Sequence, residues 1–84
     1  MLVIGSPSAR LEKGIFNGDL YVNAPNFKLN DMVVNGDIHV GVKATGFTTV
    51  KGTISGSIIY DTQAVKDAAK IDALTFVTGT QAIQ

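Results

Sequence analysis

Two aspartates, Asp19 and Asp37, occupy the same place in two copies of a short motif, Asn17-Gly18-Asp19 and Asn35-Gly36-Asp37. If the copies stack one strand apart, about 4.8 Å, the two carboxylates repel each other unless a cation or solvent screens them. Calcium accepts carboxylate and amide oxygens as ligands, which makes Asp19 and Asp37 candidate metal ligands. The competing interpretation is that both are turn residues whose side chains hydrogen-bond to nearby backbone.

The same carboxylates could serve as an acid and a base, because retaining glycosidases hold two carboxyl groups about 5 to 5.5 Å apart. β-Helical enzymes that act on polysaccharides build their sites across many coils, with Arg, Lys and several Asp in a groove. This chain has one arginine, Arg10. We therefore predict that the protein is not an enzyme and uses no cofactor.

Tyr21, His39 and Ile59 stand at equivalent outward positions of three strand-forming segments. His39 is the only histidine and the chain has no cysteine, so it has no partner for a histidine or thiolate metal site. A ladder of these side chains either packs along the surface, where each contact adds roughly 0.2 to 1 kcal/mol, or forms a partner-binding face. The partner would be a glycan, a protein or another copy.

An internal repeat positions these residues. With Gly18, Gly36 and Gly56 as a common origin, apolar side chains recur two residues before the glycine and two and four residues after it. These columns are Phe16, Val34 and Ile54; Leu20, Ile38 and Ile58; and Val22, Val40 and Tyr60. Each unit is thus a strand, a polar glycine turn and a second strand.

The glycines are 18 residues apart in the first interval and 20 in the second, which is too short for a helical repeat. Like positions stack on like in a solenoid, so the columns predict a mainly β fold, a right-handed β-solenoid of three coils over residues 9–60. The alternative is an antiparallel β meander, because Asn-Gly-Asp also forms tight hairpin turns.

The two ends differ from the repeat. Residues 1–8 are expected to form an N-terminal strand or linker, and residues 61–84 a capping helix and a terminal strand. Helix formers fill 61–70 after a possible N-cap at Asp61 or Thr62, and 74–80 returns to β-branched and aromatic residues. The N-terminal end has no comparable cap, so we expect that end to drive homo-oligomerisation.

Composition sets the remaining limits. Eighty-four residues form one domain, and seven basic groups balance seven acidic ones, so nucleic acid is not an expected partner. No stretch approaches the roughly 20 apolar residues of a membrane span. The first residues do not resemble a signal peptide. If the protein acts outside the cell, we expect the chain to be part of a longer precursor.

The run from Gly18 to Asp37 resembles the repeats of right-handed parallel β-helix segments in bacterial cell-surface and secreted proteins: it reads GDLYVNAPNFKLNDMVVNGD. The resemblance implies an extracellular spacer or attachment module. The segment from Val50 to Ile58 is also similar to repeats of bactofilins, cytoplasmic β-helical proteins that polymerise into filaments. There the Gly-x-Ile-x-Gly pattern recurs through many coils, whereas here it appears once.

Overall fold

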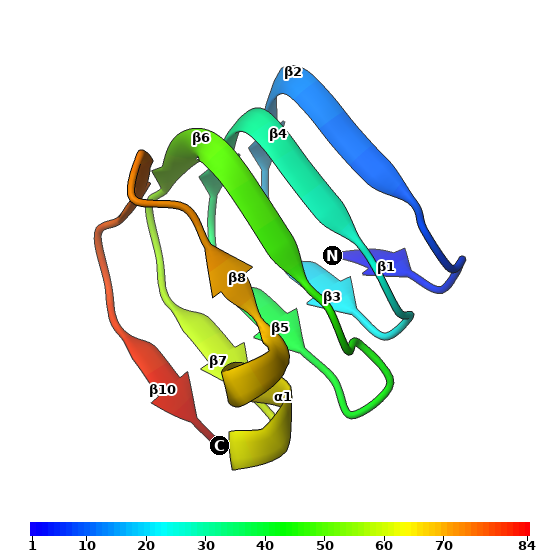
Figure 1. Ribbon diagram of the computed structural model, residues 1–84. Helices are drawn as coiled ribbons and strands as arrows, with labels where there is room; N and C mark the ends of the chain where they lie inside the picture. The colour runs from blue at the N-terminus through cyan, green and yellow to red at the C-terminus, as the bar shows by residue number, and fades with distance from the viewer.

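The computed structural model describes all residues, 1–84, and shows a β-solenoid of about four coils (Figure 1). Ten strands and one helix follow the chain in the order β1 (Leu2–Ile4), β2 (Arg10–Asn17), β3 (Leu20–Val22), β4 (Lys28–Asn35), β5 (Ile38–Val40), β6 (Thr48–Ile54), β7 (Ile58–Tyr60), α1 (Gln63–Ala68), β8 (Lys70–Ile71), β9 (Thr75–Val77) and β10 (Gln81–Ile83). The helix α1 is too short to cross a membrane.

The strands form two parallel sheets. Sheet A contains the short strands in the order β1-β3-β5-β7-β10, and sheet B contains β2-β4-β6-β8, with β9 also paired to β6. Every strand pair is parallel. The antiparallel meander is therefore wrong, because a meander would pair successive strands in opposite directions.

Figure 1 also shows the direction of winding. The chain runs toward the lower right along sheet A, climbs toward the upper left along sheet B in front and returns behind it, while each coil lies to the left of and below the previous one. This path is right-handed, as the repeat predicted.

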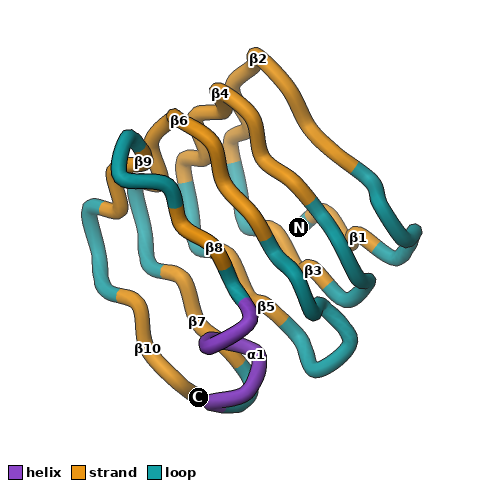
Figure 2. The backbone as a smooth tube through the Cα atoms, in the orientation of Figure 1, coloured by secondary structure: helices purple, strands orange, loops and turns teal.

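The solenoid extends beyond the three coils expected over residues 9–60. β1 pairs with β3, so residues 2–4 already belong to sheet A. At the other end β8, β9 and β10 pair with β6 and β7. The helix therefore lies at the corner between β7 and β8 and does not cover the end of the stack (Figure 2).

Each coil bends at three corners. At two of these corners one residue per coil has left-handed backbone, and most of these residues are not glycine. One corner lies between the sheets at Ser8, Asn26 and Gly46, with φ of 58°, 60° and 74°. The second bends the sheet B strands at Lys13, Asp31 and Lys51, with φ of 49°, 57° and 56°. The glycine turns form the third corner, where Gly18 has φ of 142°.

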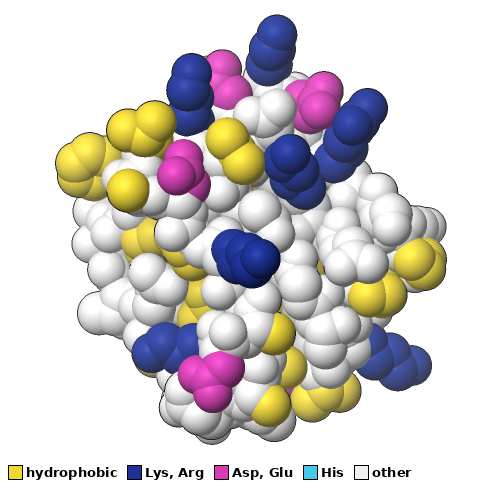
Figure 3. Space-filling view, in the orientation of Figure 1, with side chains coloured by type: hydrophobic (Ala, Val, Ile, Leu, Met, Phe, Trp, Pro, Cys, Tyr) yellow, Lys and Arg dark blue, Asp and Glu magenta, His cyan; other side chains and the backbone are white.

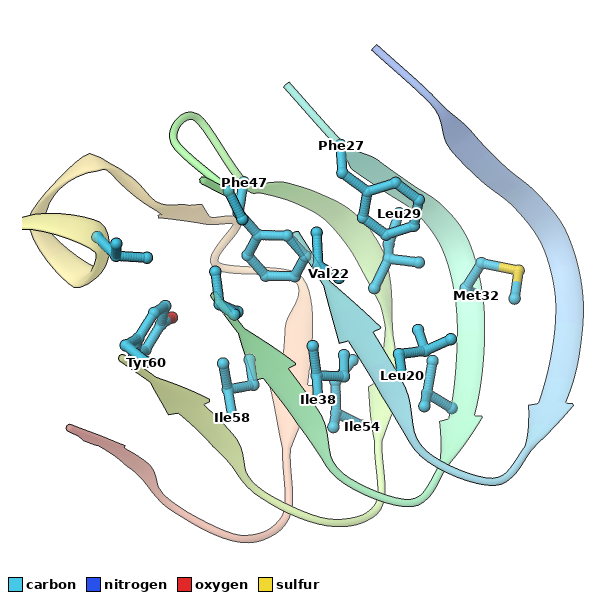
Figure 4. Packing of buried hydrophobic residues seen from close by; sticks show 14 residues of the cluster. Leu20, Val22, Phe27, Leu29, Met32, Ile38, Phe47, Ile54, Ile58 and Tyr60 are labelled. Atoms are coloured by element: carbon cyan, nitrogen blue, oxygen red, sulfur yellow. The ribbon is translucent and has the colours of Figure 1, made fainter. Parts of the chain in front are cut away.

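The core fills the space enclosed by the coils (Figure 4). The central residue of each of β3, β5 and β7 points outward, and its two neighbours are buried. All nine residues of the predicted apolar columns belong to the core or, in the case of Phe16, pack against it. Phe27 stacks on Phe47 one coil away, with ring centroids 6.2 Å apart. The alternation of apolar residues around each glycine thus produced the core.

Candidate functional site

The predicted outward ladder is present on sheet A. Tyr21, His39 and Ile59 are in register on β3, β5 and β7. The structure adds Val3 on β1 and Ala82 on β10, which extend the same column to both ends of the sheet. The alignment of the internal repeats did not reveal Val3 and Ala82, because β1 precedes the first glycine turn and β10 follows the helix.

Tyr21 and His39 stack on each other with ring centroids 4.8 Å apart and planes inclined by 16°. Because the rings come from neighbouring strands of one sheet, their faces point along the solenoid and their edges point outward. A sugar that packs on an aromatic ring needs an exposed face. The geometry therefore favours surface packing, with ring edges and the Tyr21 hydroxyl left for contacts with a partner.

Asp61 completes this site. His39 Nε2 donates a hydrogen bond to Asp61 Oδ1, and both side chains are partly buried. Asp61 lies between β7 and the N-cap residue of α1, Thr62, whose hydroxyl accepts from the backbone N–H of Val65. The pair ties sheet A to the start of the helix. The sequence did contain a signal for it, since Asp61 stands five residues after Gly56 and therefore also faces outward, one coil from His39.

The candidate metal ligands occupy the glycine corner. Asp19 Oδ1 accepts a hydrogen bond from the backbone N–H of Asp37 at 2.8 Å, and Asp37 Oδ1 accepts one from the backbone N–H of Ser57 at 2.8 Å. Ser57 Oγ continues the series by accepting from the N–H of Thr80 at 3.1 Å. No third His, Cys, Asp or Glu side chain joins the two aspartates. Each carboxylate thus supports the turn of the next coil.

A second ladder runs beside it on the other side of the glycines. Asn35 Nδ2 donates to Asn17 Oδ1 at 2.7 Å, and Ser55 Oγ donates to Asn35 Oδ1 at 2.8 Å. Side chains before and after each glycine therefore link the coils. The arrangement matches the turn interpretation of these residues.

The glycines allow these turns to stack closely. A Cβ placed on Gly36 would lie 2.2 Å from the carbonyl oxygen of Gly18, and one on Gly56 would lie 2.6 Å from that of Gly36. Gly79 occupies the same position in the next coil, where a Cβ would lie 2.7 Å from the carbonyl oxygen of Gly56. Gly79 thus forms a fourth glycine turn.

Comparison with family models, with curated proteins and with solved structures finds no match for this chain.

Proposed function

We propose that this chain is a non-enzymatic structural module that associates with further copies through the edge of β1. The observation that carries the proposal is the composition of that edge. The strand β1 consists of Leu2, Val3 and Ile4. It lacks the charged residues, prolines and β-bulges that usually keep exposed strand edges from pairing with other strands. An unprotected edge of this kind offers unpaired backbone groups to another strand.

Packing beneath the edge supports the same proposal. Leu2, Ile4, Leu11 and Phe16 pack against the core but are only partly buried, because no coil covers them on the N-terminal side. A second copy placed there would bury these side chains, and each square ångström of apolar area removed from water contributes roughly 25 cal/mol. The side-chain hydrogen bonds at the glycine corner support the same association, because they link the coils behind the β1 edge to one another.

A filament of bactofilin type is the alternative. It would require β1 of one copy to pair with β10 of the next, so that sheet A continues from copy to copy.

Attachment to a glycan or protein through Tyr21, His39 and Ile59 is a second candidate function. The outward ring edges and the Tyr21 hydroxyl favour polar contacts over stacking on a sugar. The resemblance to cell-surface β-helices supports an extracellular place for the module within a longer precursor, and the resemblance to bactofilins supports a cytoplasmic one.

Size-exclusion chromatography with light scattering measures the molar mass of the assembly and thereby tests the main proposal. Val3 points outward and is 60% exposed, so Val3→Lys adds a charge to the edge without removing a core side chain. We expect Val3→Lys to halve the molar mass of the assembly. Val42→Lys is the matched control, because Val42 is 57% exposed in a connector away from the edge. A wild-type monomer at high micromolar concentration would contradict the proposal, and open-ended polymers would support the filament instead.

A further inference from the structure

The glycine corner contains two Asn-Gly pairs whose chemistry is independent of association through β1. They are Asn17-Gly18 and Asn35-Gly36, and aspartate follows the glycine in both. Such a pair can modify itself, because the glycine nitrogen can attack Cγ of the asparagine. A bond between the nitrogen and Cγ forms, the bond between Cγ and Nδ2 breaks, and the N–H proton leaves with the side-chain amide as ammonia. Water then opens the cyclic imide to aspartate or isoaspartate. Glycine favours the attack because it has no Cβ to obstruct it.

The two pairs differ in the state of the attacking nitrogen. The N–H of Gly18 donates to the carbonyl oxygen of Asn35 at 3.1 Å. Gly56 donates to the carbonyl of Gly36 at 3.1 Å, and Gly79 donates to that of Gly56 at 2.9 Å. Gly36 is the one turn glycine whose N–H donates no hydrogen bond. The nitrogen of Gly18 must break its hydrogen bond before it can lose its proton, whereas the nitrogen of Gly36 is free to react.

The carbonyl groups that would be attacked are in similar surroundings. Both asparagines are exposed. Asn35 Oδ1 accepts from Ser55 Oγ at 2.8 Å, and Asn17 Oδ1 accepts from Asn35 Nδ2 at 2.7 Å. Attack on Cγ places negative charge on Oδ1, and a hydrogen-bond donor at that oxygen stabilises the charge. Both carbonyls have such a donor, so the difference between the two sites lies at the glycine nitrogen.

We propose that Asn35 is a self-modifying site, which deamidates in the folded protein through the free nitrogen of Gly36, while the hydrogen bond of Gly18 protects Asn17. Either product weakens the stacking of the first two coils. Aspartate at position 35 has no Nδ2 donor for Asn17 and places a carboxylate beside its Oδ1. Isoaspartate adds a methylene to the main chain next to Gly36, where a Cβ would already lie 2.2 Å from the carbonyl oxygen of Gly18.

Mass spectrometry of the aged wild-type protein tests the site. Trypsin cuts after Lys13, Lys28 and Lys43 and so places the two asparagines in different peptides. In folded protein kept at mildly alkaline pH, we expect Asn35 to react at least about fivefold faster than Asn17, the factor that breaking one hydrogen bond costs. In concentrated urea the two rates should be equal, because both pairs lie in the same Asn-Gly-Asp triplet. Equal rates in the folded protein, or a faster reaction at Asn17, would overturn the proposal.

Two measurements test the cause of the difference. Hydrogen exchange followed by NMR should show the amide of Gly36 exchanging faster than that of Gly18 in the folded state. Ser55→Ala removes the donor at Asn35 Oδ1 and should slow deamidation there in the folded protein, with no change in urea. Similar exchange of the two glycines would overturn the assignment of Gly36 as the free nucleophile. A folded Ser55→Ala protein that reacts as fast as the wild type would overturn the part given to Ser55.

The effect on the fold is measured with variants and with the reaction product. Seven basic groups balance seven acidic ones, and in Figure 3 basic and acidic side chains intermingle along the top of the molecule. Anion exchange therefore separates modified protein, which carries one more negative charge, from intact protein. We expect the modified protein to unfold at lower urea concentration. Asn35→Asp should lower the midpoint more than its matched control Asn17→Asp, which keeps an acceptor for Asn35 Nδ2. Unchanged midpoints for the modified protein, or equal midpoints for the two variants, would overturn the effect on coil stacking.

Discussion

The carboxylate of Asp19 accepts a hydrogen bond from the backbone N–H of Asp37, one coil away. The same bond is repeated between Asp37 and Ser57. Two acidic residues one strand apart are compatible here because each has a backbone donor of its own. Charge-assisted bonds of this kind are stronger than bonds between neutral groups.

Removing one of these acceptors should destabilise the fold. We expect Asp37→Ala to lower the free energy of unfolding by about 1 kcal/mol, because the N–H of Ser57 loses its partner. Asp37→Asn keeps the Oδ1 acceptor and should cost less. Urea denaturation followed by circular dichroism measures both. If Asp19 and Asp37 instead hold calcium, millimolar calcium will raise the midpoint of the wild type and not that of the Asp19→Asn/Asp37→Asn variant.

Gly52 should be far less tolerant of substitution than Gly14, although both flank Met32 in one column of sheet B. Gly52 has φ of 110°, and a Cβ there would lie 2.2 Å from the carbonyl oxygen of Met32. A Cβ on Gly14 would make an ordinary contact, 3.6 Å from Met32 Sδ. We expect Gly52→Ala to cost about 3 kcal/mol or more and Gly14→Ala to change stability by less than about 1 kcal/mol. Equal midpoints for the two variants would contradict this placement of the backbone.

Tyr60 should make the fold sensitive to alkaline pH. Burial raises the pKa of Tyr60 to about 12, above its ordinary value of 10, and its hydroxyl donates to Gln81 Oε1 at 3.0 Å. The folded state therefore keeps this proton at pH values where the unfolded chain loses it. The contribution to stability is complete below pH 10 and is lost as pH rises toward 12. Tyr60→Phe should show a smaller fall in unfolding midpoint over that interval, and parallel curves for the two proteins would count against the assignment.

The stacked pair Tyr21 and His39 should be energetically coupled. A double-mutant cycle with Tyr21→Ala and His39→Ala is expected to give about 0.5 to 1.5 kcal/mol of coupling. Asp61→Ala should lower stability too, because His39 loses its acceptor. A cycle between Tyr21 and Gln63 serves as the control, since Gln63 bonds to Asp67 within the helix region. Additive effects for Tyr21 and His39 would show that the rings do not support each other.

The repeat alone predicted the part of the fold that follows a constant spacing. The columns around Gly18, Gly36 and Gly56 fixed which residues face the core and which stack, including Tyr21 above His39. The alignment of the repeats on their glycines failed after Gly56. The helix lengthens the spacing between Gly56 and Gly79 to 23 residues, so Gly79 was not recognised as the equivalent glycine of the next coil.

Other features were hidden for a chemical reason. Lysine is not a residue that marks left-handed backbone, so Lys13 and Lys51 gave no sign of the corner that bends sheet B. The role of Asp19 and Asp37 depended on the distance to the next turn, which decides between a backbone donor and a cation. Residue types could not supply that distance.

The corner that joins sheet A to sheet B has an implication for protein engineering. The last backbone hydrogen bond before the helix joins the N–H of Asp61 to the carbonyl of Val40. The first one after the helix joins the N–H of Lys70 to the carbonyl of Phe47. The equivalent bonds in the preceding coil are made by Gly41 and Thr48. One coil thus accommodates a whole helix where another has a short connector, and the strands on either side keep their register. A foreign peptide epitope inserted between the exposed residues Val42 and Lys43, with Ala44 kept in the core, should therefore be displayed without disturbing the scaffold.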